Sequence, residues 1–92
     1  MTPETGSVQL VVYSSGFVFV GRWHYDAETD CIILTPAVCV RRTNGTSGHF
    51  EMVTGPHAAD LDKCHGAVTL PYAGLLFTVP CVEDAWAAKL LE

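Results

Sequence analysis

The sequence predicts a mainly β protein with one C-terminal helix, an α+β fold built as a small antiparallel β-barrel or rolled sheet. Three observations lead to this class. Runs of β-branched and aromatic residues alternate with short turn signals along most of the chain. One helical pattern follows, over about residues 82–91. The length, 92 residues, suits a single domain spanning residues 1–92, because a chain of this size buries roughly 60–65% of its unfolded surface.

The first two strands are joined by a tight turn. Val8–Tyr13 is typical of a strand, Ser14–Gly16 of a turn, and Phe17–Tyr25 of a second strand. The odd positions of the second strand share one face, whereas the even positions change from valine to Arg22 and His24. We therefore expect this strand to begin buried on both faces and to end with one face in water.

Pro36 divides the next apolar stretch in two. Residues 26–30 predict a polar hairpin loop, and Cys31–Thr35 predicts a third strand. Because proline cannot donate to a ladder, we expect a bend or an edge there, before Ala37–Arg42 resumes as a fourth strand. The loop expected at 43–48 contains Asn-Gly, a strong turn signal.

The elements after residue 48 are shorter. Phe50–Thr54 fits either a short strand or a helical turn, and periodicity leaves both open. His57–Gly66 predicts a long surface connection with a helical turn. Val68–Leu70 and Leu75–Val79 predict two brief strands.

The helical pattern carries acids in its first turn and Lys89 in its last, as the helix dipole favours. Val82, Trp86 and Leu90 recur at every fourth position. Such a stripe predicts a helix that packs its apolar side against the sheet.

The composition predicts an oligomer and argues against some partners. Hydrophobic residues make up 49% of the chain and charged residues only 16%, against about 25% in an average domain. We therefore expect a second copy to cover part of the apolar surface. The net charge of −5 argues against binding to polymeric nucleic acid.

The chain is predicted to lie in the cytoplasm and away from membranes. Polar residues or glycine and proline interrupt every apolar stretch well before the roughly 18–20 residues that a membrane span needs. Residues 1–7 are polar, lack the features of a signal peptide, and are expected to be flexible. The four cysteines are accordingly expected to be reduced thiols.

Catalytic and metal motifs are not evident. Cys64 and His65 are adjacent, with His49 and His57 nearby, but the four cysteines form no pair at zinc-ligand spacing. The sequence contains no nucleophile elbow and no phosphate-cradling glycine loop that opens a helix. We therefore predict a protein that is not an enzyme and needs no metal or cofactor.

Arginines and aromatic residues form the best candidate binding site. If the third strand returns antiparallel between the second and fourth, their ends meet at one edge of the sheet. Guanidinium groups bind phosphate oxygens and aromatic rings stack on bases, so the group predicts a nucleotide pocket. The alternative is that the arginines form surface ion pairs and that the tryptophan belongs to the core. The candidate residues are Arg22, Trp23, Tyr25, Arg41 and Arg42.

The order of short motifs resembles a family of small tailed-phage proteins of unknown function. Members run from an S-x-G-V-F-x-G opening to an I-P-x-x-E ending. This chain has Ser15-Gly16-Phe17-Val18-Phe19-Val20-Gly21 early and Val79-Pro80-Cys81-Val82-Glu83 late. Relatives carry a Trp- and Tyr-rich stretch where this chain has Val40–Gly45, so the role of that stretch does not carry over.

The resemblance implies a phage accessory protein that works in the host cytoplasm. By analogy, we expect an anti-defence sponge, a small oligomer that sequesters a cyclic nucleotide signal such as those of CBASS immunity, without chemistry. The alternatives are an oligomeric module that binds a host protein and a minor structural subunit of the virion.

Overall fold

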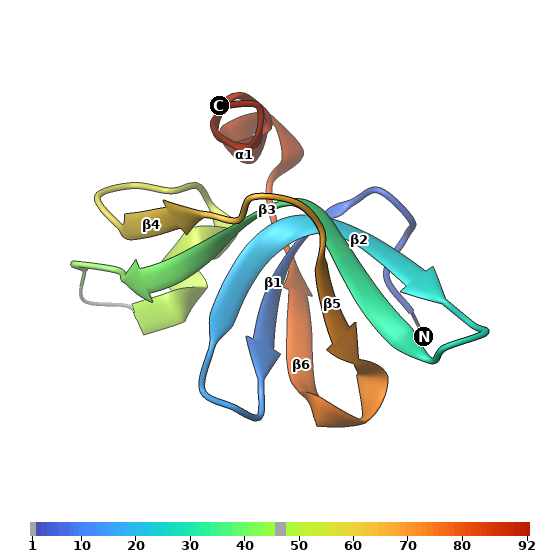
Figure 1. The fold of residues 1–92 in the computed structure, drawn as a ribbon. Coiled ribbons are helices and arrows are strands. Elements are labelled where there is room, and N and C mark those ends of the chain that lie inside the picture. Colours follow the sequence, from blue (N-terminus) through green and yellow to red (C-terminus); the bar gives the residue numbers. More distant parts are fainter. Residues whose placement is uncertain (1, 46–47) are drawn as a thin grey trace.

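The computed structural model describes residues 2–45 and 48–92 (Figure 1). They form six strands, two short 3-10 helices and one α-helix. The strands are β1 (Val8–Tyr13), β2 (Val18–Asp26), β3 (Cys31–Arg42), β4 (Asp60–Lys63), β5 (Val68–Pro71) and β6 (Leu75–Pro80). The helices are η1 (Gly48–Val53), η2 (Tyr72–Gly74) and α1 (Glu83–Leu90).

All strand pairs are antiparallel, and together they make one rolled sheet. The strands follow the order β4-β3-β2-β1-β6, and β5 pairs with the first part of β3. The path has two ends, so the sheet is rolled and not closed into a barrel. The predicted fold class, mainly β with a C-terminal helix, is confirmed.

The predicted division into a third and a fourth strand is wrong, because β3 runs without a break from Cys31 to Arg42. Its pairing with β2 shifts between Gly21 and Trp23, so that Thr35 and Pro36 together lie opposite Arg22. Proline is tolerated there because β5 pairs with β3 only before it and β4 only after it. The proline therefore bends β3 without ending it.

Both faces of the sheet are buried at its centre, which explains the continuous apolar run in β2. Val18 and Val20 belong to a cluster on the face covered by α1 and η1, with Val8, Leu10, Val38, Val40, Met52, Trp86 and Leu90. Phe19 and Trp23 belong to a cluster on the opposite face, with Val11, Ile32, Leu34 and Ala37. β2 begins buried on both faces, as expected, and Arg22 and His24 on the even face are half-buried; the exposure of Tyr25, which lies on the odd face, was not expected.

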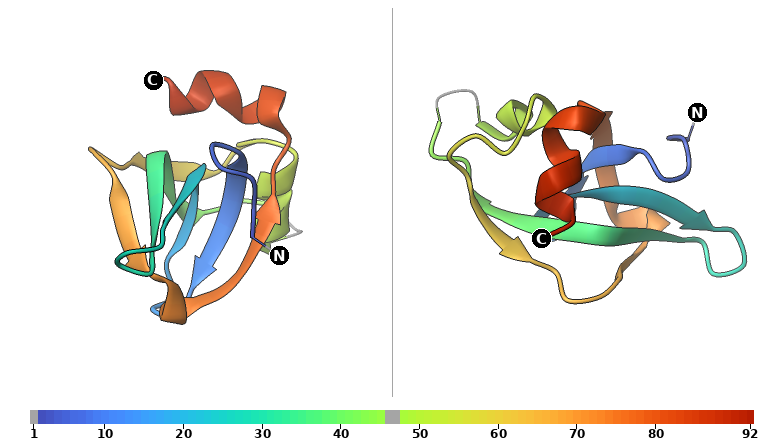
Figure 2. Two further views of the ribbon diagram at one scale, coloured as in Figure 1. Left: turned by 90° about the vertical axis from the view of Figure 1, so that its right-hand side faces the viewer. Right: turned by 90° about the horizontal axis from the view of Figure 1, so that it is seen from above.

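Helix α1 lies across one side of the rolled sheet and crosses over β2 and β3 (Figure 2). Trp86 and Leu90, both residues of α1, are buried against the sheet, as the apolar stripe predicts. Val82 precedes the helix and is 49% exposed, so its place in the stripe is wrong. None of the helices in residues 2–45 and 48–92 has the length and apolar character that a bilayer crossing requires.

The structure can be compared with the prediction for three segments that follow β3. Phe50–Thr54, for which the sequence allows a strand or a helical turn, is helical: all but Thr54 belong to η1. The connection predicted at His57–Gly66 contains strand β4, which pairs with the end of β3. The loop predicted at 43–48 lies partly outside the described residues.

The residues just before β1 continue beside β2, beyond the start of the β1–β2 ladder. The N–H of Gly6 donates to the Trp23 carbonyl at 2.7 Å, and the N–H of Trp23 donates to the Ser7 carbonyl at 2.9 Å. The prediction that residues 1–7 are flexible did not anticipate these bonds; Met1 lies outside the described residues.

Candidate functional site

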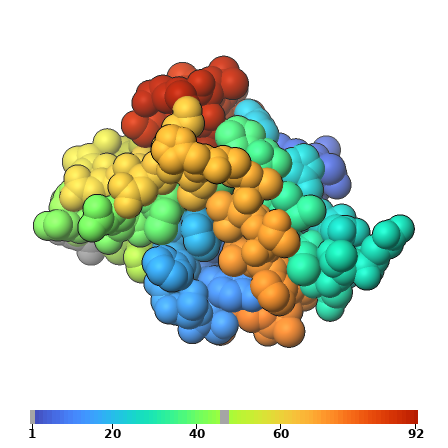
Figure 3. Space-filling view, in the orientation of Figure 1, coloured from blue at the N-terminus to red at the C-terminus, as the bar shows by residue number. Residues whose placement is uncertain are grey.

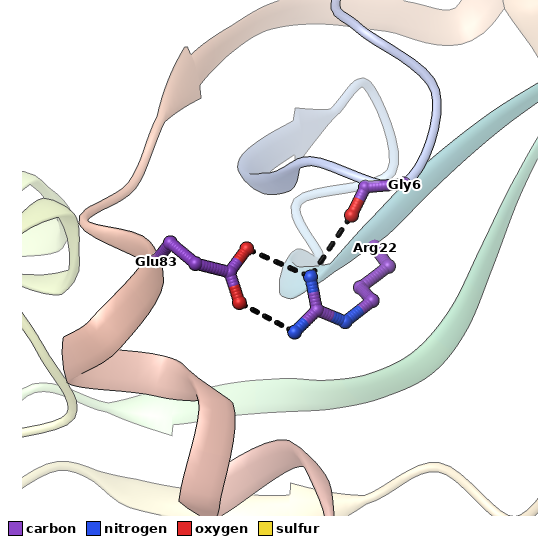
Figure 4. A network of polar contacts seen from close by, with 3 residues as sticks. All are labelled: Gly6, Arg22 and Glu83. Atoms are coloured by element: carbon purple, nitrogen blue, oxygen red, sulfur yellow. Dashed lines mark hydrogen bonds and ion pairs between the residues drawn. The ribbon is translucent and has the colours of Figure 1, made fainter.

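Arg22 is held in a structural ion pair. Its two terminal nitrogens donate to the two carboxylate oxygens of Glu83 at 2.8 and 2.6 Å, and one also donates to the Gly6 carbonyl at 2.9 Å (Figure 4). This paired geometry is the one that guanidinium and carboxylate prefer. Arg22 therefore joins β2 to the start of α1 and to the N-terminal segment, and its donors face protein groups.

The ion pair makes stability depend on pH in a defined direction. The hydrogen bond from Arg22, aided by its charge, lowers the pKa of Glu83 from the ordinary 4.5, although desolvation opposes this. A carboxyl whose pKa is lowered in the folded state stabilises the fold above its unfolded pKa. That contribution is lost as the pH falls through the lowered value.

We expect Glu83→Gln to lower the thermal midpoint slightly at pH 7, since the Glu83 side chain is 51% exposed and the pair is screened by solvent. The difference from wild type should shrink as the pH falls below about 4. Thermal unfolding of both proteins across this range measures it. A difference that stays constant down to pH 3 would contradict the assigned role of the pair.

Trp23 and Tyr25 are poorly placed to stack on a ligand at Arg22. Trp23 is 1% exposed and packs in the core. The Tyr25 hydroxyl donates to the Asp30 carboxylate at 2.5 Å, and its ring meets Tyr72 edge-on at 5.5 Å. The hydrogen bond to Asp30, together with desolvation and the charges of Asp30 and Asp26, raises the pKa of Tyr25. An anion at this position would meet carboxylates.

Arg41 and Arg42 lie exposed at the end of β3 and form open ion pairs with β4. The Arg41 Nε is 3.5 Å from an Asp62 carboxylate oxygen, and the Arg42 Nε is 3.4 Å from an Asp60 oxygen. All four side chains are more than half exposed. Exposed pairs of this kind contribute about 0–1 kcal/mol each to stability. An anionic ligand can therefore take the place of the aspartates as the partner of the two guanidinium groups with little loss of stability.

A groove of about 450 Å³ lies beside this pair of arginines, between the end of β3, β4 and the last turn of α1. We call it the cationic groove. A shift in the β3–β4 register between Val40 and Arg42 helps both arginines to line it, because a bulge re-aims neighbouring side chains. Its volume is in the range of small-molecule sites, although it is open to solvent. The charged residues that line it are Arg41, Arg42, Asp60, Asp62 and Lys89.

A second hollow, of about 570 Å³, adjoins the first and shares Arg41 and Asp62 with it. Phe17 lines this second hollow, which we call the Phe17 hollow, and is 58% exposed. An exposed ring beside a guanidinium offers a stacking surface next to a phosphate-binding group. Phe17 is a candidate that sequence reasoning missed, because the apolar pattern places it in the buried start of the predicted second strand, whereas β2 begins at Val18 and Phe17 is exposed.

The distribution of charge sets this region apart from the rest of the molecule. Four of the five basic residues lie on the end of β3, β4 and α1: Arg41, Arg42, Lys63 and Lys89. In the space-filling view, β4 in yellow lies between the green end of β3 and the red helix (Figure 3). Three cations and two carboxylates line the cationic groove, whereas the whole chain carries a net charge of −5. An anion is therefore drawn to this surface in preference to the others.

The structure thus brings Arg41 and Arg42 together and leaves Arg22, Trp23 and Tyr25 elsewhere. The predicted convergence at one edge is wrong because β3 is one strand. Arg22 lies opposite its middle, and Arg41 lies about six residues further along, roughly 20 Å at the rise of a strand. Lys89 joins the groove because α1 crosses the sheet, a contact that local sequence patterns do not reveal.

The cysteines are free thiols and partly buried. Burial raises the pKa of Cys39 and Cys64, and it raises that of Cys81 to about 11. Such thiols stay protonated at neutral pH. Within the described part of the chain, no three histidine, cysteine or acidic side chains are grouped so as to hold a metal ion.

Comparisons with protein-family models, with curated proteins and with solved structures give no match to this chain. The resemblance to small tailed-phage proteins therefore stays a prediction, and the function has to be argued from the site itself.

Proposed function

We propose that the protein binds a small anionic ligand of the nucleotide type in the cationic groove and sequesters it without chemistry. The observation that carries this proposal is that three of the five basic residues, Arg41, Arg42 and Lys89, line one groove of an otherwise acidic chain. The proposal moves the site from Arg22, Trp23 and Tyr25 to the end of β3, and it keeps Arg41 and Arg42 in the predicted role of phosphate clamps.

The chemistry of the groove suits a phosphate. Each guanidinium offers several fixed donors that match phosphate oxygens. Lys89 adds a third positive charge, and its ammonium group forms an exposed ion pair with Glu92 at 3.1 Å. Asp60 and Asp62 hold the arginines in place while the groove is empty of ligand and are exposed enough to release them.

The neighbouring Phe17 hollow favours a nucleotide over a bare phosphate. A ligand whose phosphate meets Arg41 can extend a base across the shared wall onto the Phe17 ring. A cyclic dinucleotide has both parts and is small enough for the two hollows. A long nucleic acid strand would meet the acidic remainder of the surface, which repels it.

The biological setting rests on the resemblance. A tailed-phage accessory protein in the host cytoplasm that captures a cyclic nucleotide alarm signal would blunt the defence that depends on this signal. A sponge needs only affinity and abundance, and the geometry described supports binding by preorganised charges.

Calorimetric titration tests the proposal, with a panel of cyclic di- and trinucleotides and with inorganic phosphate as the probes. We expect at least one nucleotide to bind at micromolar concentration. We expect Arg42→Gln to weaken it roughly tenfold or more, since a hydrogen bond to a charged group is worth about 1.5–3 kcal/mol. Added salt should weaken binding further.

Arg22→Gln is the matched control, because it removes the same charge from a residue that faces Glu83. It should leave the affinity unchanged. No heat with any member of the panel would overturn the proposal, and so would equal affinity of wild type and Arg42→Gln.

The two other functions expected from the sequence stay predictions. A host-protein module predicts a stoichiometric partner in a pull-down from host lysate, and a virion subunit predicts co-purification with particles.

A further inference from the structure

The three strands at the margins of the sheet differ in how they are protected. Free strand edges tend to pair with other chains, and proteins commonly block them with charges, with proline or by keeping them short. β4 carries three charges in four residues, and β5 is four residues long and ends in Pro71. β6 also ends in a proline, Pro80, but it is six residues long and has no charged residue. β6 is therefore the margin most open to pairing.

Exposed apolar side chains gather at the same strand. Leu76 is 63% exposed and Phe77 is 43% exposed, and both belong to β6. Phe50 of η1, itself 58% exposed, stacks on Phe77 with ring centroids 6.0 Å apart and planes inclined by 17°. Clusters of this kind on a small protein mark an interaction surface.

The backbone of β6 has polar groups to offer on its outer side. The N–H of Cys81 donates to the Val8 carbonyl at 2.9 Å, just beyond the β1–β6 ladder. Since hydrogen-bonding direction alternates along an antiparallel strand, Val79 and Phe77 face β1. The N–H and C=O of Thr78 then point away from the sheet. Pro80 also faces outward but has no N–H to donate, so the donors of this edge lie on the Phe77 side of Pro80. The Thr78 hydroxyl donates to the Gln9 side chain at 3.0 Å, so only the backbone of Thr78 is available to pair with another strand.

We propose that β6 pairs antiparallel with β6 of a second copy of this chain, about a two-fold axis near Phe77. The occupant is a second copy for a reason of charge. A neutral strand can pair with itself with no like charges opposed, whereas two copies with net charge −5 repel each other across most other surfaces. Antiparallel self-pairing is also the arrangement that a two-fold axis produces.

The pairing would create a continuous apolar seam. The two Phe77 side chains would lie opposite each other across the axis, with Phe50 of each copy stacked outside them. The sheet would continue from one copy into the next. This also accounts for the low charged content of the chain, 16%. The inference does not depend on the cationic groove, which is built on β3 and β4 at the other end of the strand order.

Size-exclusion chromatography with light scattering tests the pairing. We expect wild type at about 100 µM to have twice the chain mass of 9.9 kDa. Phe77→Glu and Phe77→Lys should each be monomeric, because the new charges face their own copies across the axis. An equimolar mixture of these two variants should recover the dimer, since unlike charges then meet.

Leu91→Glu is the control, because Leu91 is 83% exposed and lies after α1. It should remain dimeric. Circular dichroism checks that each variant is folded, and calorimetry of the monomeric Phe77→Glu should show nucleotide affinity unchanged, which separates this inference from the proposed function. A monomeric wild type, a dimeric Phe77→Glu, or a mixture of the two variants that stays monomeric would overturn the pairing.

Discussion

Trp86→Ala is expected to lower the free energy of unfolding by about 3–5 kcal/mol, the range for removing a large buried aromatic side chain. Trp86 is fully buried where α1 meets the sheet. Its indole N–H donates to the Met52 carbonyl at 2.6 Å, so one side chain joins α1, η1 and the sheet. A loss of this size is a large share of the stability of a small domain.

Urea unfolding followed by circular dichroism measures this effect. Trp86→Phe keeps most of the ring but removes the hydrogen bond, and we expect an intermediate loss. Leu91→Ala serves as the control, because an exposed side chain should change stability by no more than about 0.5 kcal/mol. A loss below about 1 kcal/mol for Trp86→Ala would contradict the packing of α1 on the sheet.

Gly21→Ala is expected to lower the free energy of unfolding by about 1–3 kcal/mol, as overpacking does. A Cβ at this position would lie 2.7 Å from the Ala37 Cβ and 2.8 Å from the Pro36 carbonyl oxygen. These atoms belong to β3 at its bend, so they cannot move aside as a flexible side chain would. The glycine in the apolar stretch of β2 is thus explained by the close approach of β3.

A double-mutant cycle checks the cause. Ala37→Gly in the Gly21→Ala background should recover part of the loss, because the contact with the Ala37 Cβ disappears while those with the Pro36 carbonyl oxygen and the Cα of residue 37 remain. Urea unfolding of the two single variants and the double variant gives the coupling energy. If the changes in the free energy of unfolding of the two single variants add up to that of the double variant, a steric clash between positions 21 and 37 is not the cause of the loss.

Local patterns predicted much of the fold. β1, β2 and α1 lie within about one residue of their expected bounds, since each has a clear periodicity and a turn or cap beside it. β4 was missed because Asp60–Lys63 has little preference for strands. It forms because the end of β3 offers it partners, and such partners are not visible in local sequence.

The bend at Pro36 shows the same limit. Proline is a valid signal for a break in a ladder, and the ladder beside β3 does change there, from β5 to β4. Whether the strand itself ends is decided by β2, which pairs on both sides of the bend. The predicted site assumed that a strand ends near Pro36. Because β3 continues past Pro36, Arg22 does not lie at the same edge as Arg41 and Arg42.

Arg22 beside Trp23 illustrates what sequence can and cannot supply for a site. The pair stands out because a guanidinium follows a run of apolar residues. Its explanation, the carboxylate of Glu83, lies 61 residues further along the chain. The groove at Arg41 and Arg42 likewise depends on Lys89, which belongs to α1.

The central claim is that a nucleotide binds between β3, β4 and α1. An NMR titration of the amide resonances of the wild-type protein with the best ligand from the calorimetric panel tests it most directly. We expect the largest shifts at Arg41, Arg42, Asp62 and Lys89, with smaller shifts at Phe17. Shifts centred on Arg22–Tyr25, or no shifts at saturating ligand, would contradict it.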